Sequence, residues 1–210
     1  MEQKTFEYLK MSLPSIDRRN VLPSLIASPE NYLIISGLAG AAKDTAALTD
    51  DGPNSFSMAG AMGASVSIGL GVSISASNKK VMVIAGDGEI LMNLGSIATV
   101  ATVYPPNLSI ICMDNGCHGE TGGQHGHTSI RTDLEKIAIG AGFKSTLTIS
   151  KSNELQKGKK FLQAADGPKF LVVKISKGLS KQYKRNLDPA DCRLRFKNFF
   201  LKQKINIVEN

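Results

Sequence analysis

The most constraining feature of this sequence is residues 81–124, where two apolar segments flank a helix-forming segment. Val81–Ala85 and Leu108–Met113 have the length and composition of buried strands. Between them, Ile90–Val103 predicts a helix that ends before Pro105-Pro106, because proline cannot continue it. A strand, a helix and a parallel strand form one right-handed crossover unit. The turns after the two strands are therefore expected side by side at the carboxyl edge of the sheet, where open α/β sheets bind ligands.

Both turns carry oxygen ligands. Gly86-Asp87-Gly88 follows the first strand and offers a carboxylate, and Asn115 follows the second and offers an amide oxygen. Such hard ligands suit Mg²⁺ or Ca²⁺, and Mg²⁺ usually shares its shell with substrate phosphates. The N–H groups of Gly88, Glu89 and Ile90 are expected at a helix start, which favours anions. A metal ion bound to a diphosphate would use both the oxygen ligands and the N–H groups. The alternative is an ordinary strand–helix–strand unit with two tight turns and no ligand.

The Gly-Asp-Gly triplet, 26 intervening residues (89–114) and then Asn115 resemble the metal–diphosphate motif of thiamine diphosphate enzymes. The wider string GDGEILMNLGSIATVA…PPNLSIICMDNG…GETGGQ resembles the diphosphate-binding half of the phosphonopyruvate and sulfopyruvate decarboxylase group. The resemblance covers residues 17–204. It implies two cofactors, thiamine diphosphate and Mg²⁺.

The resemblance also implies particular site residues. The metal ligands would be Asp87, Asn115 and the backbone oxygen of Cys117. Met62 matches the bulky apolar residue that holds the cofactor in its bent shape, although methionine is more often core filler. Lys43 stands in a Gly-Ala-Ala-Lys stretch where the family usually has Ser or Thr; it could face the diphosphate or equally be a solvated helix lysine. The full cofactor-binding set is Gly37, Gly40, Lys43, Gly60, Met62, Gly86, Asp87, Gly88, Glu89, Asn115, Cys117 and Gly119.

The glycine-rich loop 116–127 holds all three histidines of the chain. His118, His127 and Gln124 are the candidates for substrate contact or proton delivery. Zinc is an alternative for three clustered histidines, but their spacing matches no familiar zinc site. A loop rich in glycine and polar groups more often covers a substrate or contacts another subunit.

The remaining pattern alternates strands with helices and predicts a doubly wound, mostly parallel sheet of about six strands with helices on both faces. Phe56 opens an expected small-residue helix that runs through Ser77; it is nearly long enough for a membrane span, but its Ser and Gly content indicates a buried helix. The other expected strands are Tyr32–Ser36, Lys144–Ile149 and Lys169–Ile175, and the other expected helices are Arg18–Ala27 with Asp17 as N-cap, Thr132–Gly142, Asn153–Ala165 and Asp191–Gln203.

We expect a lead-in at residues 1–16, one thiamine diphosphate-binding domain at residues 17–176 and a basic C-terminal segment at residues 177–210. The net charge is +7, and the last segment contributes nine Lys/Arg against three acids. Because it lacks interleaved aromatic residues and a recognisable nucleic-acid module, a solvated tail or a subunit contact is favoured over nucleic-acid binding. Three cysteines without CxxC spacing and an N-terminus without an apolar core predict a cytoplasmic protein with no membrane segment.

The function implied by the resemblance is decarboxylation of a small anionic 2-oxo acid, such as phosphonopyruvate or 3-sulfopyruvate, to an aldehyde. Single-chain relatives carry an activating glutamate on a preceding domain, and neither Glu89 nor Glu120 matches that role. We therefore expect a separate pyrimidine-binding (alpha) subunit to complete the site. The alternatives are a subunit of an acetolactate synthase-like carboligase, a subunit of a 2-oxoacid oxidoreductase, and a cofactor-binding partner without catalytic activity.

Overall fold

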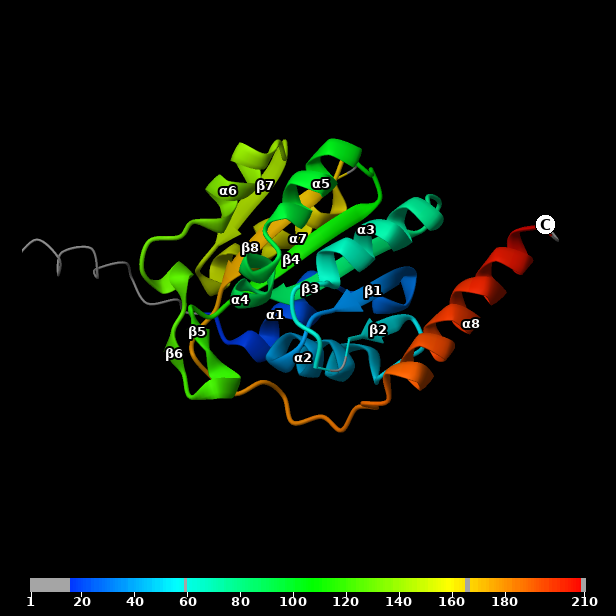
Figure 1. Ribbon diagram of the computed structural model, residues 1–210, viewed down its shortest axis with the longest axis horizontal. Coiled ribbons are helices and arrows are strands. Elements are labelled where there is room, and N and C mark those ends of the chain that lie inside the picture. Colours follow the sequence, from blue (N-terminus) through cyan, green and yellow to red (C-terminus); the bar gives the residue numbers. More distant parts are fainter. Residues whose placement is uncertain (1–15, 59, 165–166, 209–210) are drawn as a thin grey trace, which may run out of the picture.

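The computed structural model describes residues 16–58, 60–164 and 167–208 (Figure 1). Most of the expected lead-in, with its amphipathic segment 6–13, lies outside the described residues. Ile16 is the exception: it forms a parallel bridge to Ile175 and is fully buried.

A six-stranded sheet, parallel throughout, forms the centre of the molecule (Figure 1). Its strands, in spatial order, are β2 (Ser55–Ser57), β1 (Tyr32–Ser36), β3 (Lys80–Gly86), β4 (Leu108–Asp114), β8 (Lys169–Lys174) and β7 (Ser145–Ile149). β2 pairs with one side of β1, and the next strand in the sequence, β3, pairs with the other side of β1. The predicted doubly wound α/β fold is confirmed.

Helices cover both faces of the sheet, because successive strand residues point to opposite faces. On β4, Ile110 and Cys112 join one apolar cluster, whereas Ile111 and Met113 join the other. The first face carries α3 (Ser65–Ser75), α5 (Gly95–Val103) and α6 (Leu134–Ala141), and the second carries α1 (Arg18–Leu25), α2 (Ala39–Thr49) and α7 (Leu155–Gln163).

The helix expected at Ile90–Val103 is wrong in extent. The chain enters α4 (Asp87–Met92) directly from β3, so Gly86-Asp87-Gly88 is not a separate turn, and α5 begins only at Gly95. Asn93 leaves the helical conformation between them, and its carbonyl oxygen accepts a hydrogen bond from the Ser96 hydroxyl at 2.7 Å. Asparagine and glycine are weak helix formers, which favours the break at this point.

The small-residue helix expected to open at Phe56 is also wrong in extent. Residues 55–57 instead form β2, and the helix α3 begins at Ser65. The side chain of Asn54 donates to the backbone oxygens of Pro29 and Tyr32, which holds the start of β2 beside β1. Within α3 the small residues act as expected: a Cβ at Gly69 would lie 2.2 Å from Cγ2 of Val83, so only glycine allows this close approach to the sheet.

The other helices and strands with predicted bounds match them to within a few residues at their ends, except that α8 continues to Val208 instead of ending at Gln203. No bounds are predicted for helix α2. Asp17 caps α1 and Asp133 caps α6, each accepting a backbone N–H in its side chain. The loop after β4 contains an unpredicted two-stranded hairpin, β5 (Cys117–His118) and β6 (Gln124–His125). Short 3-10 turns occupy Pro29–Asn31, Gly119–Thr121, His127–Ser129 and Ser152–Glu154. No helix among the described residues is long and apolar enough to cross a membrane.

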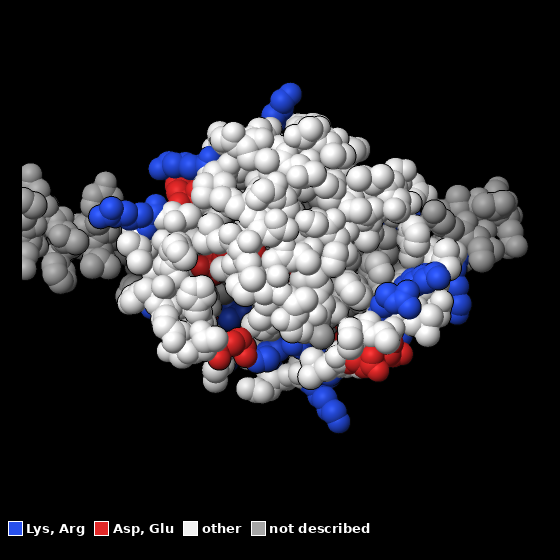
Figure 2. Space-filling view, viewed as in Figure 1, with Lys and Arg blue, Asp and Glu red and all other residues white. Residues whose placement is uncertain are grey.

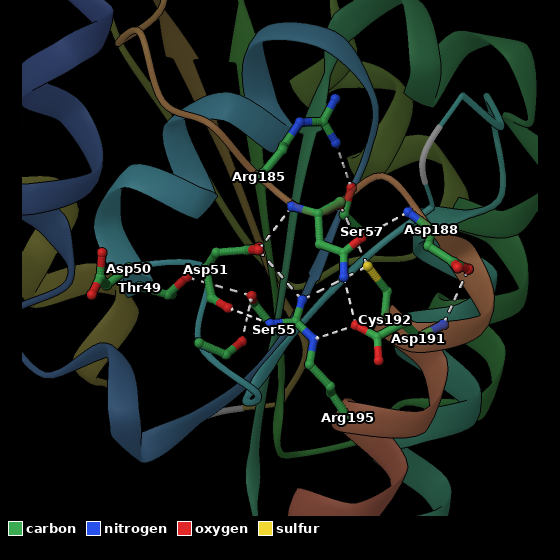
Figure 3. A network of polar contacts seen from close by, with 12 residues as sticks. Thr49, Asp50, Asp51, Ser55, Ser57, Arg185, Asp188, Asp191, Cys192 and Arg195 are labelled. Carbon is green, nitrogen blue, oxygen red and sulfur yellow. Dashed lines mark hydrogen bonds and ion pairs between the residues drawn. The ribbon is translucent and has the colours of Figure 1, made fainter.

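The basic C-terminal segment packs on its own chain, so the interpretation of a merely solvated tail is wrong. After β8 the chain passes along α2 and enters α8 (Pro189–Val208) beside β2 (Figure 1). Figure 3 shows the polar contacts at this corner: Arg185 donates to Ser57 at 2.8 Å, and Arg195 donates to the backbone oxygen of Asp51 at 2.9 Å. The rings of Phe196 and Phe56 lie 6.0 Å apart. The segment thereby covers a sheet edge that would otherwise be open.

Candidate active site

The segments that follow β3 and β4 begin side by side at the carboxyl edge of the sheet. Gly86 pairs with Met113 in the register of β3 and β4. Asp87, which directly follows β3, and Asp114, the last residue of β4, therefore lie at neighbouring strand ends. The strand order reverses between β1 and β3, which are parallel neighbours, and there the N–H of Gly37 donates to the oxygen of Ile84 at 2.8 Å. A crevice at such a switch point is the usual ligand site of open α/β sheets.

Asp87 is buried against a second acid. One hydroxyl, that of Thr128, lies 2.8 Å from Oδ2 of Asp87 and 2.7 Å from Oδ1 of Asp114. Burial raises the pKa of Asp87, and the charge of Asp114 raises it further, while Thr128 and nearby backbone N–H groups oppose the shift. Lys174, at the end of β8, forms an ion pair with Asp114. The positive charge at this edge therefore neutralises Asp114 rather than Asp87.

Asn115 and Cys117 form the second turn. The side-chain oxygen of Asn115 accepts the backbone N–H of Cys117 at 3.1 Å, and the N–H of Gly116 donates to Asp114 at 3.0 Å. Gly116 has φ +63°, and a Cβ there would lie 2.9 Å from Cβ of Ser129. The turn is thus tightly built, with its amide oxygen at the sheet edge.

Three other predicted residues gather beside Asp87. A Cβ placed on Gly88 would lie 3.3 Å from Cε1 of His118 and 3.5 Å from Cε of Met62. His118 is half-buried, and Met62 is 39% exposed. The structure therefore brings a methionine, a histidine and the start of α4 together, although they come from three separate segments.

Glu89 lies under the first glycine-rich turn. Its carboxylate accepts the N–H of Leu38 at 2.9 Å, and a Cβ on Gly37 would lie only 1.8 Å from its Oε2. Its other oxygen and the Ser65 hydroxyl are buried, and neither makes a hydrogen bond of normal geometry among the described residues. Burial raises the pKa of Glu89, and the nearby Ser65 hydroxyl and backbone N–H groups oppose the shift. Glu89 thus joins α4 to the end of β1.

Gly40 and Lys43 lie on α2 with other neighbours. A Cβ on Gly40 would lie 2.0 Å from the guanidinium of Arg18, which forms a buried ion pair with Asp44 at 2.8 Å. Lys43 forms an ion pair with Glu120 of the hairpin loop at 3.2 Å. Gly40 therefore leaves room for a structural ion pair, and Lys43 connects α2 to the loop that carries the histidines.

The remaining predicted residues are more open to solvent. Gln124 closes the hairpin by exchanging hydrogen bonds with Thr121, at 2.7 and 3.0 Å. His127 is exposed at the start of a 3-10 turn. Gly60, Gly86 and Gly119 have no atom within 3.9 Å of a placed Cβ. The structure thus places Gln124 and His127 on the surface of the loop rather than against Asp87.

Sequence reasoning missed Asp114, Thr128 and Lys174 as parts of this site. Asp114 directly precedes Asn115, so its place at the strand end was visible in the sequence. Thr128 lies 41 residues from Asp87 in an irregular loop, and Lys174 lies 60 residues from Asp114. No local pattern marks either of them.

The donor set fits a divalent cation. The described residues contain no group of three His, Cys, Asp or Glu side chains arranged to hold a metal ion. A cation here would be held by a mixed set of oxygens, the carboxylate of Asp87, the amide of Asn115 and the carbonyl of Cys117, as Mg²⁺ prefers. Asp87 is 4% exposed, and no ion pair joins it to a cationic side chain among the described residues. A bound cation would supply the missing positive charge.

Comparison with known proteins shows the family of the chain. Residues 43–173 match the family model for the thiamine pyrophosphate enzyme, C-terminal TPP binding domain. The chain is 35% identical over 196 residues to sulfopyruvate decarboxylase subunit beta of Methanocaldococcus jannaschii, covering 93% of this chain and 96% of that one. It is 33% identical over 172 residues to phosphonopyruvate decarboxylase of Streptomyces viridochromogenes, covering 81% of this chain and 43% of that longer protein.

A solved structure shares the fold. The 2-oxoglutarate:ferredoxin oxidoreductase of Magnetococcus marinus superposes with a TM-score of 0.61 at 14% identity, over 80% of this chain and 62% of that one. The parallel sheet with helices on both faces defines a doubly wound α/β domain, a class that binds ligands at the switch point of its sheet. The chain belongs to the thiamine pyrophosphate enzyme family, as its C-terminal TPP-binding domain, and its homologues include sulfopyruvate and phosphonopyruvate decarboxylases.

Proposed function

We propose that this chain is the thiamine diphosphate- and Mg²⁺-binding subunit of a decarboxylase that acts on an anionic 2-oxo acid such as 3-sulfopyruvate or phosphonopyruvate. The observation that carries the proposal is the match to nearly the whole length of a sulfopyruvate decarboxylase beta subunit. The buried Asp87 at the switch-point edge, without a cationic side chain of its own, supports the metal half of the proposal.

The chain's own residues would divide the work. Asp87, Asn115 and the carbonyl of Cys117 would hold the metal ion, and Met62 would support the cofactor next to Gly88. Thiamine diphosphate, when bound, supplies the electron sink for the carbanion left by loss of carbon dioxide. His118, beside Gly88, is the best placed of the candidate residues for substrate contact or proton delivery, with His127 and Gln124 further out on the loop.

The experiment that tests the function is a decarboxylation assay of the chain purified with its partner subunit. Carbon dioxide release is measured with 3-sulfopyruvate, phosphonopyruvate and pyruvate, with Mg²⁺ and thiamine diphosphate present. We expect turnover of one of the two dianionic substrates and little turnover of pyruvate. Turnover of pyruvate alone, or of none of the three, would contradict the proposal.

The loop histidines give a prediction within this site. His118→Ala is expected to lower kcat by at least about a hundredfold, because proton transfer by a positioned side chain typically contributes that much or more. His127→Ala is expected to lower it less, since His127 is exposed on the loop surface. Thiamine diphosphate should bind both variants as it binds the original protein, which a fluorescence titration checks.

His125→Ala is the matched control. His125 lies on the same hairpin, where Nδ1 is 3.3 Å from Oγ of Ser129, and the proposal gives it no role in turnover. Unchanged turnover in His118→Ala and His127→Ala would remove both histidines from the site.

We also propose that the partner is a pyrimidine-binding subunit and that it docks on the face formed by α3 and α5. Neither helix contains a charged residue, and Figure 2 shows this face as a broad uncharged area. Ile74 and Val103 are exposed near the C-terminal ends of the two helices, and Met92, at the end of α4 before α5 begins, is 65% exposed. The core of a protein–protein interface is typically depleted of charged residues, as this face is. Met92 also contacts Gly63, which links this face to the segment carrying Met62.

The docking face gives a second prediction. Ile74→Glu and Thr99→Arg are expected to prevent co-purification of the partner, because each places a charge in a contact that excludes water. Both side chains are exposed in the single chain, so its melting temperature should change little. Gln156→Glu on α7, which covers the opposite face, is the control. Recovery of the partner in the original amount with both variants would exclude this face.

Cytoplasmic residence is a further part of the proposal. All three cysteines, Cys112, Cys117 and Cys192, are free thiols. Disulfides are rare in the reducing cytoplasm, so free thiols support this location.

A further inference from the structure

The hydroxyl of Thr128 lies between two carboxylates at the candidate metal site. It is 2.8 Å from Oδ2 of Asp87 and 2.7 Å from Oδ1 of Asp114, both within hydrogen-bond distance. Thr128 belongs to the short turn His127–Ser129, which the chain reaches only after the β5–β6 hairpin. The contact therefore ties the far end of the loop to the ends of β3 and β4.

The two acids depend on this hydroxyl to different degrees. Asp114 also accepts hydrogen bonds from Lys174 and from the N–H of Gly116. For Asp87, Thr128 is the only side chain among the described residues that donates a hydrogen bond. A hydroxyl has a single hydrogen, so it can donate to only one carboxylate at a time. Because Asp114 has other donors, removal of the hydroxyl affects Asp87 most.

Close packing of the segment around Thr128 holds its hydroxyl beside Asp87. The N–H of Gly126 donates to the oxygen of Gly116 at 2.8 Å. A Cβ on Gly126 would lie 3.2 Å from Oδ2 of Asp87 and 3.1 Å from the backbone carbon of Gly116. The backbone at residue 126 is thus bonded to Gly116 and lies close to the carboxylate of Asp87, and Thr128 follows two residues later.

We propose that Thr128 is a positioning residue for the metal site: its hydroxyl holds the carboxylate of Asp87 in one orientation and so sets the affinity of the site for a divalent cation. The proposal rests on the function proposed above, because it presumes that Asp87 is a metal ligand. Groups that hold metal ligands by hydrogen bonds commonly contribute to metal affinity even though they do not touch the metal.

The competing explanation is that Thr128 only anchors the loop. An anchor would affect the stability of the protein, whereas a positioning residue affects cation binding in protein that is fully folded. The valine variant separates these roles because it keeps the shape of threonine and removes only the hydroxyl. The serine variant restores the hydroxyl and should restore the affinity.

The experiment measures binding of Mn²⁺ to the assembly in which the chain purifies. Electron paramagnetic resonance measures the concentration of free Mn²⁺ in each titration. Titrations are made with Mn²⁺ alone and with Mn²⁺ plus thiamine diphosphate. For Thr128→Val we expect the dissociation constant of Mn²⁺ to rise by about tenfold or more, the range that loss of a group supporting a metal ligand typically causes. For Thr128→Ser we expect a value close to that of the original protein.

Thr146→Val is the matched control. The Thr146 hydroxyl donates to the carboxylate of Glu135 at 3.1 Å, between β7 and α6, so its removal breaks the same kind of contact away from the site. It should leave Mn²⁺ binding unchanged. Folding of each variant is verified by its melting temperature, and if Thr128→Val does not fold, Thr128→Ala takes its place.

The outcomes distinguish the two proposals. Tight Mn²⁺ binding by the original protein and by Thr128→Val alike would overturn the role of Thr128 and leave the proposed function intact. Weakened binding in Thr128→Val that Thr128→Ser does not recover would also overturn it, because the hydroxyl would not be the cause. No Mn²⁺ binding by the original protein, with or without thiamine diphosphate, would contradict the proposed function itself.

Discussion

Asp87→Asn is expected to abolish Mg²⁺-dependent binding of thiamine diphosphate while leaving the folded chain at least as stable as before. The substitution removes the one carboxylate in the proposed ligand set. We expect the cation to bind at least about a hundredfold more weakly, because changes to groups that only support a ligand already cost about ten- to a hundredfold. Calorimetric titration with Mg²⁺ and thiamine diphosphate measures this loss.

The expected gain in stability follows from the pKa of Asp87. Burial, and then the charge of Asp114, raise that pKa above the ordinary value of 3.8, so the folded protein holds the proton more tightly than the unfolded chain does. The contribution of Asp87 to the stability of the cation-free protein is therefore most favourable with the carboxyl protonated and is lost as the pH rises from 3.8 through the raised pKa. Asparagine stays neutral and avoids this cost, and its side-chain oxygen can still accept from Thr128.

Asp133→Asn is the control for this prediction. Asp133 caps α6, and asparagine is an equally good N-cap, so cofactor binding should not change. Loss of the exposed ion pair with Lys136 should cost no more than about 1 kcal/mol of stability. If Asp87→Asn bound thiamine diphosphate and Mg²⁺ like the original protein, the proposed metal site would be excluded. If it unfolded, Asp87 would have a structural role that the raised pKa does not suggest.

Gly37→Ala is expected to produce the second large effect, a loss of about 3 kcal/mol in the free energy of unfolding. A Cβ at residue 37 would lie 1.8 Å from Oε2 of Glu89, so the carboxylate must move away from the N–H of Leu38. Overpacking a core costs about 1–3 kcal/mol, and losing a hydrogen bond to a charged group costs about 1.5–3 kcal/mol. The expected fall in melting temperature is about 6–12 °C for a chain of this size. Chemical denaturation of the chain measures it.

Two further variants decide whether Glu89 causes the loss. The double variant Gly37→Ala/Glu89→Ala should cost less than the sum of the two single variants, because removal of Glu89 makes room for the new methyl group. Gly71→Ala is the control: it is exposed on α3 with no atom within 4 Å of a placed Cβ, and alanine should stabilise the helix by about 0.5–1 kcal/mol. Additive costs in the double variant would show that the two residues do not interact.

Much of the fold could be predicted because most of its strands are recognisable from neighbouring residues in the sequence. The central strands are short apolar runs bounded by turn residues, and β1 was predicted to the residue as Tyr32–Ser36. Edge strand β2 was missed because it has only three residues, and its pairing with β1 depends on contacts such as those of Asn54. The break between α4 and α5 was missed for a similar reason, since apolar residues continue on both sides of Asn93.

In the candidate site, too, some features could be predicted from neighbouring residues and others depend on tertiary contacts. Asp87 and Asn115 are predicted at one edge because they follow the two strands of a strand–helix–strand unit, and the pairing of Gly86 with Met113 confirms that these strands end side by side. Glu89 was expected to face the diphosphate, and that role stays a prediction; the structure shows its carboxylate bound to the N–H of Leu38 under Gly37. The direction of a side chain on a short helix depends on what lies above it, which the sequence does not show.

The sequence by itself determined the class of fold and the neighbouring strands that Asp87 and Asn115 follow, because strand periodicity and turn residues act over a few neighbouring positions. The metal–diphosphate motif rests on a resemblance to thiamine diphosphate enzymes, and its role stays a prediction. Only the tertiary structure decided that Thr128 reaches Asp87, that Lys174 neutralises Asp114 and that the C-terminal segment covers β2. These contacts join residues 41, 60 and 128 positions apart. Such pairs meet only when the whole chain packs, so no local pattern records them.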